Sequence, residues 1–151
     1  MVVSCTLRQA QSRISALTLI DSGASAYAFI NKSFAQHHSL SLHPLTYPRR
    51  LQGFDDQTAR TRDITHVAET TIALEGHIER LFLYVTGLNQ YLIILGLSWL
   101  RCHGIDASFE FNTLTMSLSF CLTHCCSMSV TIHGVTQEEE DFLLPKESQC
   151  V

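Results

Sequence analysis

The sequence predicts one mostly β domain built from many short strands, with one or two short helices. Runs rich in Thr, Val, Ile, Phe and Tyr, which favour pleated strands, extend from Ile64 to Leu74 and from His77 to Val85. Glu75-Gly76 separates these two runs and predicts a hairpin turn. The 151 residues, of which 46% are hydrophobic, suit a single packed core, and no stretch of the chain repeats another.

The first half of the chain shows the same pattern of short elements. Residues 16–20 (ALTLI) form a β-favouring run that ends at the turn residues Asp21-Ser22-Gly23. Residues 31–38 (NKSFAQHH) predict a short helix with a polar N-cap. Pro44 and Pro48 then bracket an expected loop.

In the second half, the continuous apolar run 91–95 (YLIIL) predicts a strand that is buried on both faces. Ser98 can cap a short helix that continues through His103, and Trp99 in this helix is expected to pack in the core. Two further short strands are expected around residues 105–111 and 114–118.

These elements suggest three segments. Residues 1–15 are polar with scattered apolar side chains and predict a lead-in or an edge strand. Residues 16–120 carry the folded domain. Residues 121–151 form a Cys-containing and acidic extension, expected to be partly disordered because it has few apolar residues and a run of carboxylates.

Charge and hydropathy exclude several classes of protein. A net charge of −4 provides no basic field for nucleic acid. The longest apolar stretch, residues 91–97, falls far below the roughly 20 residues that cross a bilayer, so no membrane association is expected. No secretory signal is visible at the start of the chain, and we therefore expect an intracellular, cytoplasmic protein.

The six cysteines fit that location, because thiols stay reduced in the cytosol. The cluster Cys121-Leu-Thr-His124-Cys125-Cys126 raises the alternative of a structural zinc site, since thiolates and imidazole are good zinc ligands. The spacing matches no paired ligand motif, and the eight histidines show no His-Glu-x-x-His pattern. Ordinary reduced cysteines are the favoured interpretation, and no metal or organic cofactor is expected.

The sharpest chemical feature is Asp21-Ser22-Gly23-Ala24, which directly follows an apolar strand. This order delivers a carboxylate at a strand end on a tight turn, where Gly23 allows backbone angles that other residues avoid. The Ser22 hydroxyl is placed to hydrogen-bond across the turn and hold it. Two such carboxylates close together share a proton, so that one acts as a base and the other as an acid. An ordinary Asp-Ser-Gly turn is the alternative.

A second motif lies downstream, where Ile94-Leu95-Gly96 is followed by Trp99-Leu100. The two motifs, in this order, resemble the retroviral-type aspartic peptidases (retropepsins) and, among them, those of gypsy-type long-terminal-repeat retrotransposons. The resemblance covers roughly residues 17–118. It implies a closed β-barrel of the acid-protease fold, with one lobe in each chain.

The resemblance also implies a flap, a β hairpin that closes over the substrate between the two motifs. The candidate residues are Gly53, Phe54, Asp55 and Asp56, where Gly53 and the two aspartates favour a turn. A plain exposed hairpin turn is the alternative for this segment.

The predicted function is that of an aspartic endopeptidase that cleaves a retrotransposon polyprotein. Asp21 is the candidate catalytic residue, with Ser22, Gly23 and Ala24 supporting its loop. The chain contains one Asp-Ser/Thr-Gly, so the second Asp21 has to come from a second copy in a homodimer. The alternative is a catalytically inactive module of the same fold that dimerises or binds peptides.

Overall fold

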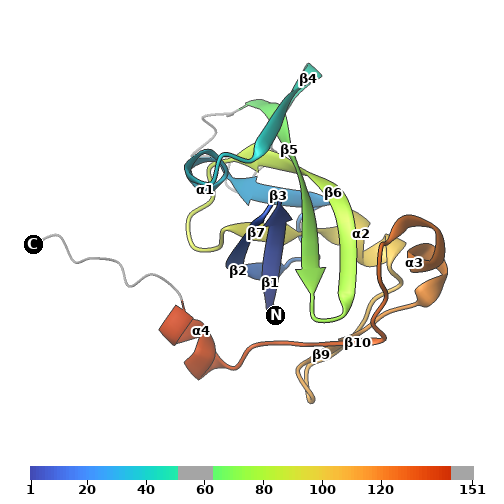
Figure 1. The fold of residues 1–151 in the computed structure, drawn as a ribbon. Helices are drawn as coiled ribbons and strands as arrows, with labels where there is room; N and C mark the ends of the chain where they lie inside the picture. The colour runs from blue at the N-terminus through green and yellow to red at the C-terminus, as the bar shows by residue number, and fades with distance from the viewer. Residues whose placement is uncertain (51–62, 144–151) are drawn as a thin grey trace, which may run out of the picture.

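The computed structural model describes residues 1–50 and 63–143 of the chain. Its centre is a closed barrel of six strands (Figure 1), in which each strand pairs with the next around the ring in the order β1-β2-β7-β3-β6-β5 and back to β1. The six strands are β1 (Val2–Gln9), β2 (Ser12–Ile20), β3 (Ala28–Asn31), β5 (Asp63–Leu74), β6 (His77–Thr86) and β7 (Ile93–Leu95). The structure thus confirms the predicted mostly β fold and its closed barrel.

The remaining elements lie outside this ring. They are α1 (Lys32–His37), β4 (Ser41–Arg50), α2 (Leu97–Cys102), β8 (Asp106–Ser108), β9 (Thr113–Thr115), α3 (Leu118–His124), β10 (Thr131–His133) and α4 (Gln137–Leu143). β8, β9 and β10 form a small separate sheet. Figure 1 shows α2 and α3 on the same side of the barrel, and the ring of His103 after α2 lies 4.7 Å from that of Phe120 in α3.

Several predicted elements are confirmed. The Glu75-Gly76 hairpin joins β5 to β6, with Glu75 at φ 51° in the left-handed region. Asn31 caps α1, since its side-chain oxygen accepts from the backbone N–H of Phe34 at 3.0 Å. β7 lies between β2 and β3, which explains why its sequence is apolar on both faces.

Three expectations are corrected. Residues 1–15 are not a lead-in, because β1 pairs along its whole length with β2 and also closes the barrel against β5. Pro44 and Pro48 do not bracket a loop but lie in β4, where a register shift separates the paired residues Pro44 and Arg49. β4 is at the edge of the sheet, and an edge strand tolerates proline because its outer side donates to no neighbour. Ser98 does not cap α2, since Gly96 holds that position.

Buried apolar side chains from the barrel and α2 fill the core, among them Leu7, Ile30, Leu83, Ile93 and Trp99. Trp99 is completely buried, as the sequence predicted. The extension also contributes, because Cys121 of α3 and Ile132 of β10 belong to the same apolar cluster. The helix α4, by contrast, buries none of its residues. No helix in the described part of the chain is long and apolar enough to cross a membrane.

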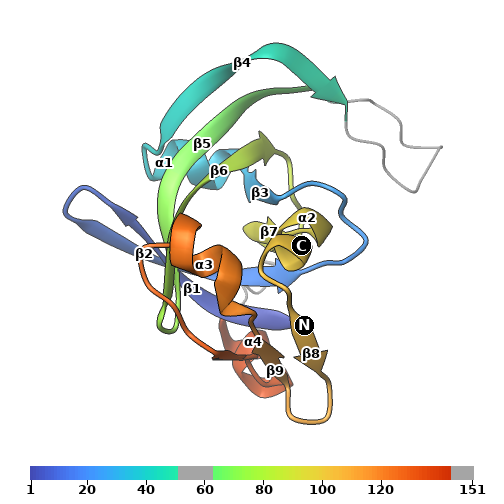
Figure 2. The same ribbon diagram turned by 90° about the vertical axis from the view of Figure 1, so that its right-hand side faces the viewer.

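Figure 2 shows β4 and β5 arching side by side away from the barrel. Their pairing runs as far as Arg50 opposite Asp63. The candidate flap residues Gly53, Phe54, Asp55 and Asp56 follow directly in the sequence and lie outside the described residues.

Candidate active site

Two neighbouring strand ends position Asp21. β2 and β7 run parallel, with Ile20 opposite Leu95, so the residues that follow them, Asp21 and Gly96, emerge at the same edge of the barrel. The backbone N–H of Asp21 donates to the carbonyl of Leu95 at 3.0 Å, which extends the ladder by one step. The two sequence motifs therefore meet in space.

Two hydrogen bonds within the loop hold the turn after Asp21. The Asp21 carboxylate accepts from the N–H of Gly23 at 2.8 Å, and the Asp21 carbonyl accepts from the N–H of Ala24 at 3.2 Å. The first bond fixes the direction of the carboxylate and leaves acceptor capacity on the group, which is half-buried.

Gly96 and Leu97 hold this loop through two backbone hydrogen bonds. Its N–H donates to the Tyr27 carbonyl at 2.9 Å, and the next amide, of Leu97, donates to the Ala24 carbonyl at 2.7 Å. A Cβ on Gly96 would lie 2.1 Å from the Ala26 carbonyl oxygen, closer than two such atoms approach. The backbone angle does not require glycine here, since a φ of −96° is open to any residue. Glycine is required because a side chain at position 96 has no space.

The hydroxyl of Ser98 also holds the loop, by donating to the Ser25 carbonyl at 2.7 Å. Ser22 was expected to do so, but it is exposed and faces another hollow, lined by Leu97, Leu100 and Phe109 among others. The supporting role of Ser22 stays a prediction, while Ser98, which was expected to cap α2, supports the loop instead.

Asp21, Gly23 and Ala24 line one groove of about 580 Å³. Its other lining residues come from β3, β4, β5, β6 and the segments around β7, and include Phe29, Arg49, Arg50, Ile64, Tyr84, Thr86, Leu88 and Ile94. Asp21 is the sole carboxylate among the described residues that line it. Tyr84 and Thr86 are two residues apart in β6, so the sequence places both on one face of this strand. Only the closed barrel shows that this face borders the groove.

A groove of this size, lined by one carboxylate together with aromatic and cationic side chains, can accept an extended peptide. Against known proteins, the family model of the PEG10/RTL1 protease domain matches residues 17–125, well over half of the chain. The chain belongs to this family. It is therefore a retropepsin-like protease domain of a group that derives from gypsy retrotransposons, in agreement with the resemblance that its two motifs carry.

A solved structure supports the fold of this retropepsin-like domain. The retroviral protease-like domain of Ddi1 from Leishmania major superposes with a TM-score of 0.60, over 92% of this chain and 96% of that one. The two sequences are 19% identical, so the likeness bears on the fold alone.

The cysteines and histidines are arranged differently from the sequence expectation. Cys126 and His124 of the suspected zinc cluster are exposed, and His124 stacks on Phe120 instead. Cys121 and Cys125 come close to two histidines from distant parts of the chain, His77 and His103. Local spacing could not reveal this group, because His77 and Cys121 lie 44 positions apart in the sequence.

A buried carboxylate adjoins that group. Glu79 is 2% exposed and accepts from the Tyr27 hydroxyl at 2.9 Å and from the indole of Trp99. Burial acts to raise the pKa of Glu79, but the neighbouring side chains of His77, Trp99, His103 and Tyr27 together hold that pKa below its ordinary value. A buried carboxylate among these side chains was not anticipated from the sequence.

Proposed function

We propose that this domain is an aspartic endopeptidase that works as a homodimer on polypeptide substrates. The observation that carries the proposal is the carboxylate of Asp21, which accepts from the Gly23 amide and lines a groove of about 580 Å³. Membership of a protease-domain family supports the same reaction.

The reaction needs two carboxylates, and the described residues of one chain bring one to the groove. Asp21 stands in the one Asp-Ser/Thr-Gly of the sequence, and the barrel uses a single copy of the fold. A second chain related by a two-fold axis would place a second Asp21 opposite the first. The site is therefore incomplete without a partner copy.

In the proposed mechanism, one Asp21 carboxylate accepts a proton from a water molecule held between the two. The water oxygen attacks the scissile carbonyl carbon, while the protonated partner carboxyl donates toward the carbonyl oxygen and the amine leaves after receiving a proton. No covalent intermediate with the enzyme forms. A polyprotein that contains the domain is the proposed natural substrate.

The experiment is a digestion of a denatured protein mixture at mildly acidic pH, with and without a pepstatin-type inhibitor, followed by mass spectrometry of the peptides. We expect inhibitor-sensitive cleavage from the parental domain and none from Asp21→Asn, which preserves the size of the side chain. Cleavage by the Asp21→Asn variant at the parental rate would refute the proposal. A folded, dimeric parental protein that cleaves nothing would support the inactive peptide-binding module.

Mixed dimers provide the sharper test of the shared site. With about nine Asp21→Asn chains per parental chain, random pairing leaves about a tenth of the parental chains in fully parental dimers, so activity per parental chain should fall about ten-fold. Unchanged activity per parental chain, in a mixture shown by sedimentation to exchange subunits, would refute a site built from two copies.

A further inference from the structure

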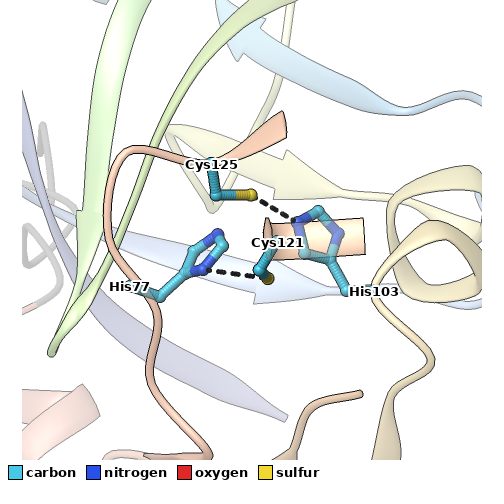
Figure 3. Close-up of side chains that lie close together, drawn as sticks. All are labelled: His77, His103, Cys121 and Cys125. Atoms are coloured by element: carbon cyan, nitrogen blue, oxygen red, sulfur yellow. Dashed lines mark hydrogen bonds between the residues drawn. The ribbon is translucent and has the colours of Figure 1, made fainter. Parts of the chain in front are cut away.

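Four potential metal ligands that do not line the Asp21 groove lie close together (Figure 3). They are His77 at the start of β6, His103 after α2, Cys121 in α3 and Cys125 just after α3. One donor atom from each lies within 4.8 Å of all the others. His77, His103 and Cys121 are buried, and Cys125 is half-buried.

The spacing of the donor atoms suits a tetrahedral ion. The Sγ of Cys121 is 3.8 Å from Nδ1 of His77, and the Sγ of Cys125 is 3.6 Å from Nε2 of His103. In a tetrahedral zinc site with Zn–S near 2.3 Å and Zn–N near 2.0 Å, neighbouring donors are about 3.3–3.8 Å apart. These two separations fall within or at the edge of that range.

Hydrogen bonding fixes which nitrogen of His103 is free. Its Nδ1 lies 2.9 Å from the carbonyl oxygen of Trp99, which can only accept, so Nδ1 carries the proton. In the neutral imidazole Nε2 then keeps its lone pair, and this nitrogen lies 3.6 Å from Sγ of Cys125 and 3.7 Å from Oε2 of Glu79. A ligating histidine whose other nitrogen donates to a backbone carbonyl is the usual arrangement in metal sites.

His77 has a complementary arrangement and an unsatisfied atom. Its Nε2 is completely buried without a hydrogen-bond partner in the described structure, and it lies 3.5 Å from Oε1 of Glu79. A small movement of the ring would let Nε2–H donate to Glu79. Nδ1 would then present its lone pair toward Cys121, with Glu79 as the outer carboxylate that orients a ligating histidine.

We propose that His77, His103, Cys121 and Cys125 bind one structural zinc ion that fastens α3 to the barrel. Two thiolates and two imidazoles in a closed tetrahedral set are typical of structural zinc, since no position is left open for substrate. Binding would release the two thiol protons to solvent and leave a neutral zinc centre. This differs from the sequence-based expectation of no metal, and it does not depend on the proposed peptidase activity.

The site would strengthen the attachment of α3 to the barrel. Cys121 is the one buried residue of α3, a helix of seven residues. The segment after it rejoins the barrel through backbone bonds between Ile78 and residues 126–127. A zinc ion shared by α3, β6 and the end of α2 would join these three elements through metal–ligand bonds, independent of apolar burial.

The test is metal analysis of the full chain, purified in reducing buffer, loaded with zinc and dialysed. We expect about one zinc per chain. Cobalt(II) loaded in place of zinc should give the absorption of tetrahedral cobalt with a sulfur-to-metal charge-transfer band, which reports thiolate ligands directly in the unmodified protein.

Matched variants locate the ligands. Cys125→Ser should weaken zinc binding more than the about 10–100-fold that is typical of losing an outer partner. Cys126→Ser alters the next residue, whose side chain is exposed, and should keep full affinity. Cys102→Ser is the same control beside His103, since Cys102 is exposed as well.

Three results would overturn the inference. One is a folded, reduced chain that binds neither zinc nor cobalt, which would mean that the cluster consists of two S–H···N hydrogen bonds. Another is equal loss of metal in Cys126→Ser and Cys125→Ser. The third is a Cys121–Cys125 disulfide, seen by mass spectrometry, in the chain as isolated from reducing buffer. Circular dichroism of each variant shows whether lost binding follows from lost folding.

Discussion

Replacing Gly96 with alanine should displace the loop that carries Asp21, the proposed catalytic residue, and the structure gives the contacts that force the displacement. The new Cβ would lie 2.1 Å from the Ala26 carbonyl oxygen and 2.7 Å from the Ala24 carbonyl oxygen. Both neighbours are backbone atoms, so no side-chain rotation can relieve the contact. The loop from Asp21 to Tyr27 would have to move by more than about 1 Å to restore ordinary contacts.

This movement should affect both stability and catalysis. Overpacking of this kind typically costs about 1–3 kcal/mol of unfolding free energy. The loop also carries Asp21, and a displacement of about 1 Å in a catalytic group can lower the rate about 100-fold. We therefore expect Gly96→Ala to fold with a lowered thermal transition and to lose at least about 100-fold in the peptide-cleavage rate.

Gly76→Ala is the matched control. Gly76 lies in the β5–β6 turn, where a new Cβ would meet the Cβ of Ser129 at 3.5 Å, an ordinary contact. Its unfolding free energy should stay within about 1 kcal/mol of that of the parent. Its cleavage rate should stay within a few-fold of the parental rate. Peptide hydrolysis and thermal unfolding are measured for both variants. Parental stability and activity in Gly96→Ala would refute the claim that the loop backbone leaves no room for a side chain at position 96.

Three further outcomes are expected. At zinc concentrations about 100 times the dissociation constant, bound zinc adds about 2.7 kcal/mol to the free energy of unfolding. Removing the zinc with a chelator should therefore lower the melting temperature by about 5–11 °C, and an unchanged melting temperature would argue against the site. Glu79→Gln should weaken zinc binding about 10–100-fold in a competition titration, because a neutral amide accepts less strongly from His77 than the Glu79 carboxylate does. Deleting residues 137–151 should change the unfolding free energy by less than about 1 kcal/mol in denaturant melts, since α4 buries no residue, and a larger loss would show that the tail docks.

The sequence by itself determined the local features. The turn chemistry of Asp21-Ser22-Gly23 predicted a carboxylate at a strand end, and the apolar run before Gly96 predicted a strand buried on both faces. The β5–β6 hairpin followed from β-favouring runs on either side of Glu75-Gly76. Such features depend on residues within a few positions of one another, where backbone preferences and side-chain periodicity decide the conformation.

Tertiary structure decided what distant segments do together. The pairing of Thr6 with Ala73 closes the barrel, and no local pattern in β1 specifies this partner. In the same way, the edge position of β4 admits its prolines, although proline in isolation predicts a loop. The meeting of His77 with Cys121 and Cys125 depends on how α3 folds back on β6. These contacts join residues far apart in sequence, and their geometry follows from the register of the whole sheet, which a single strand or helix does not encode.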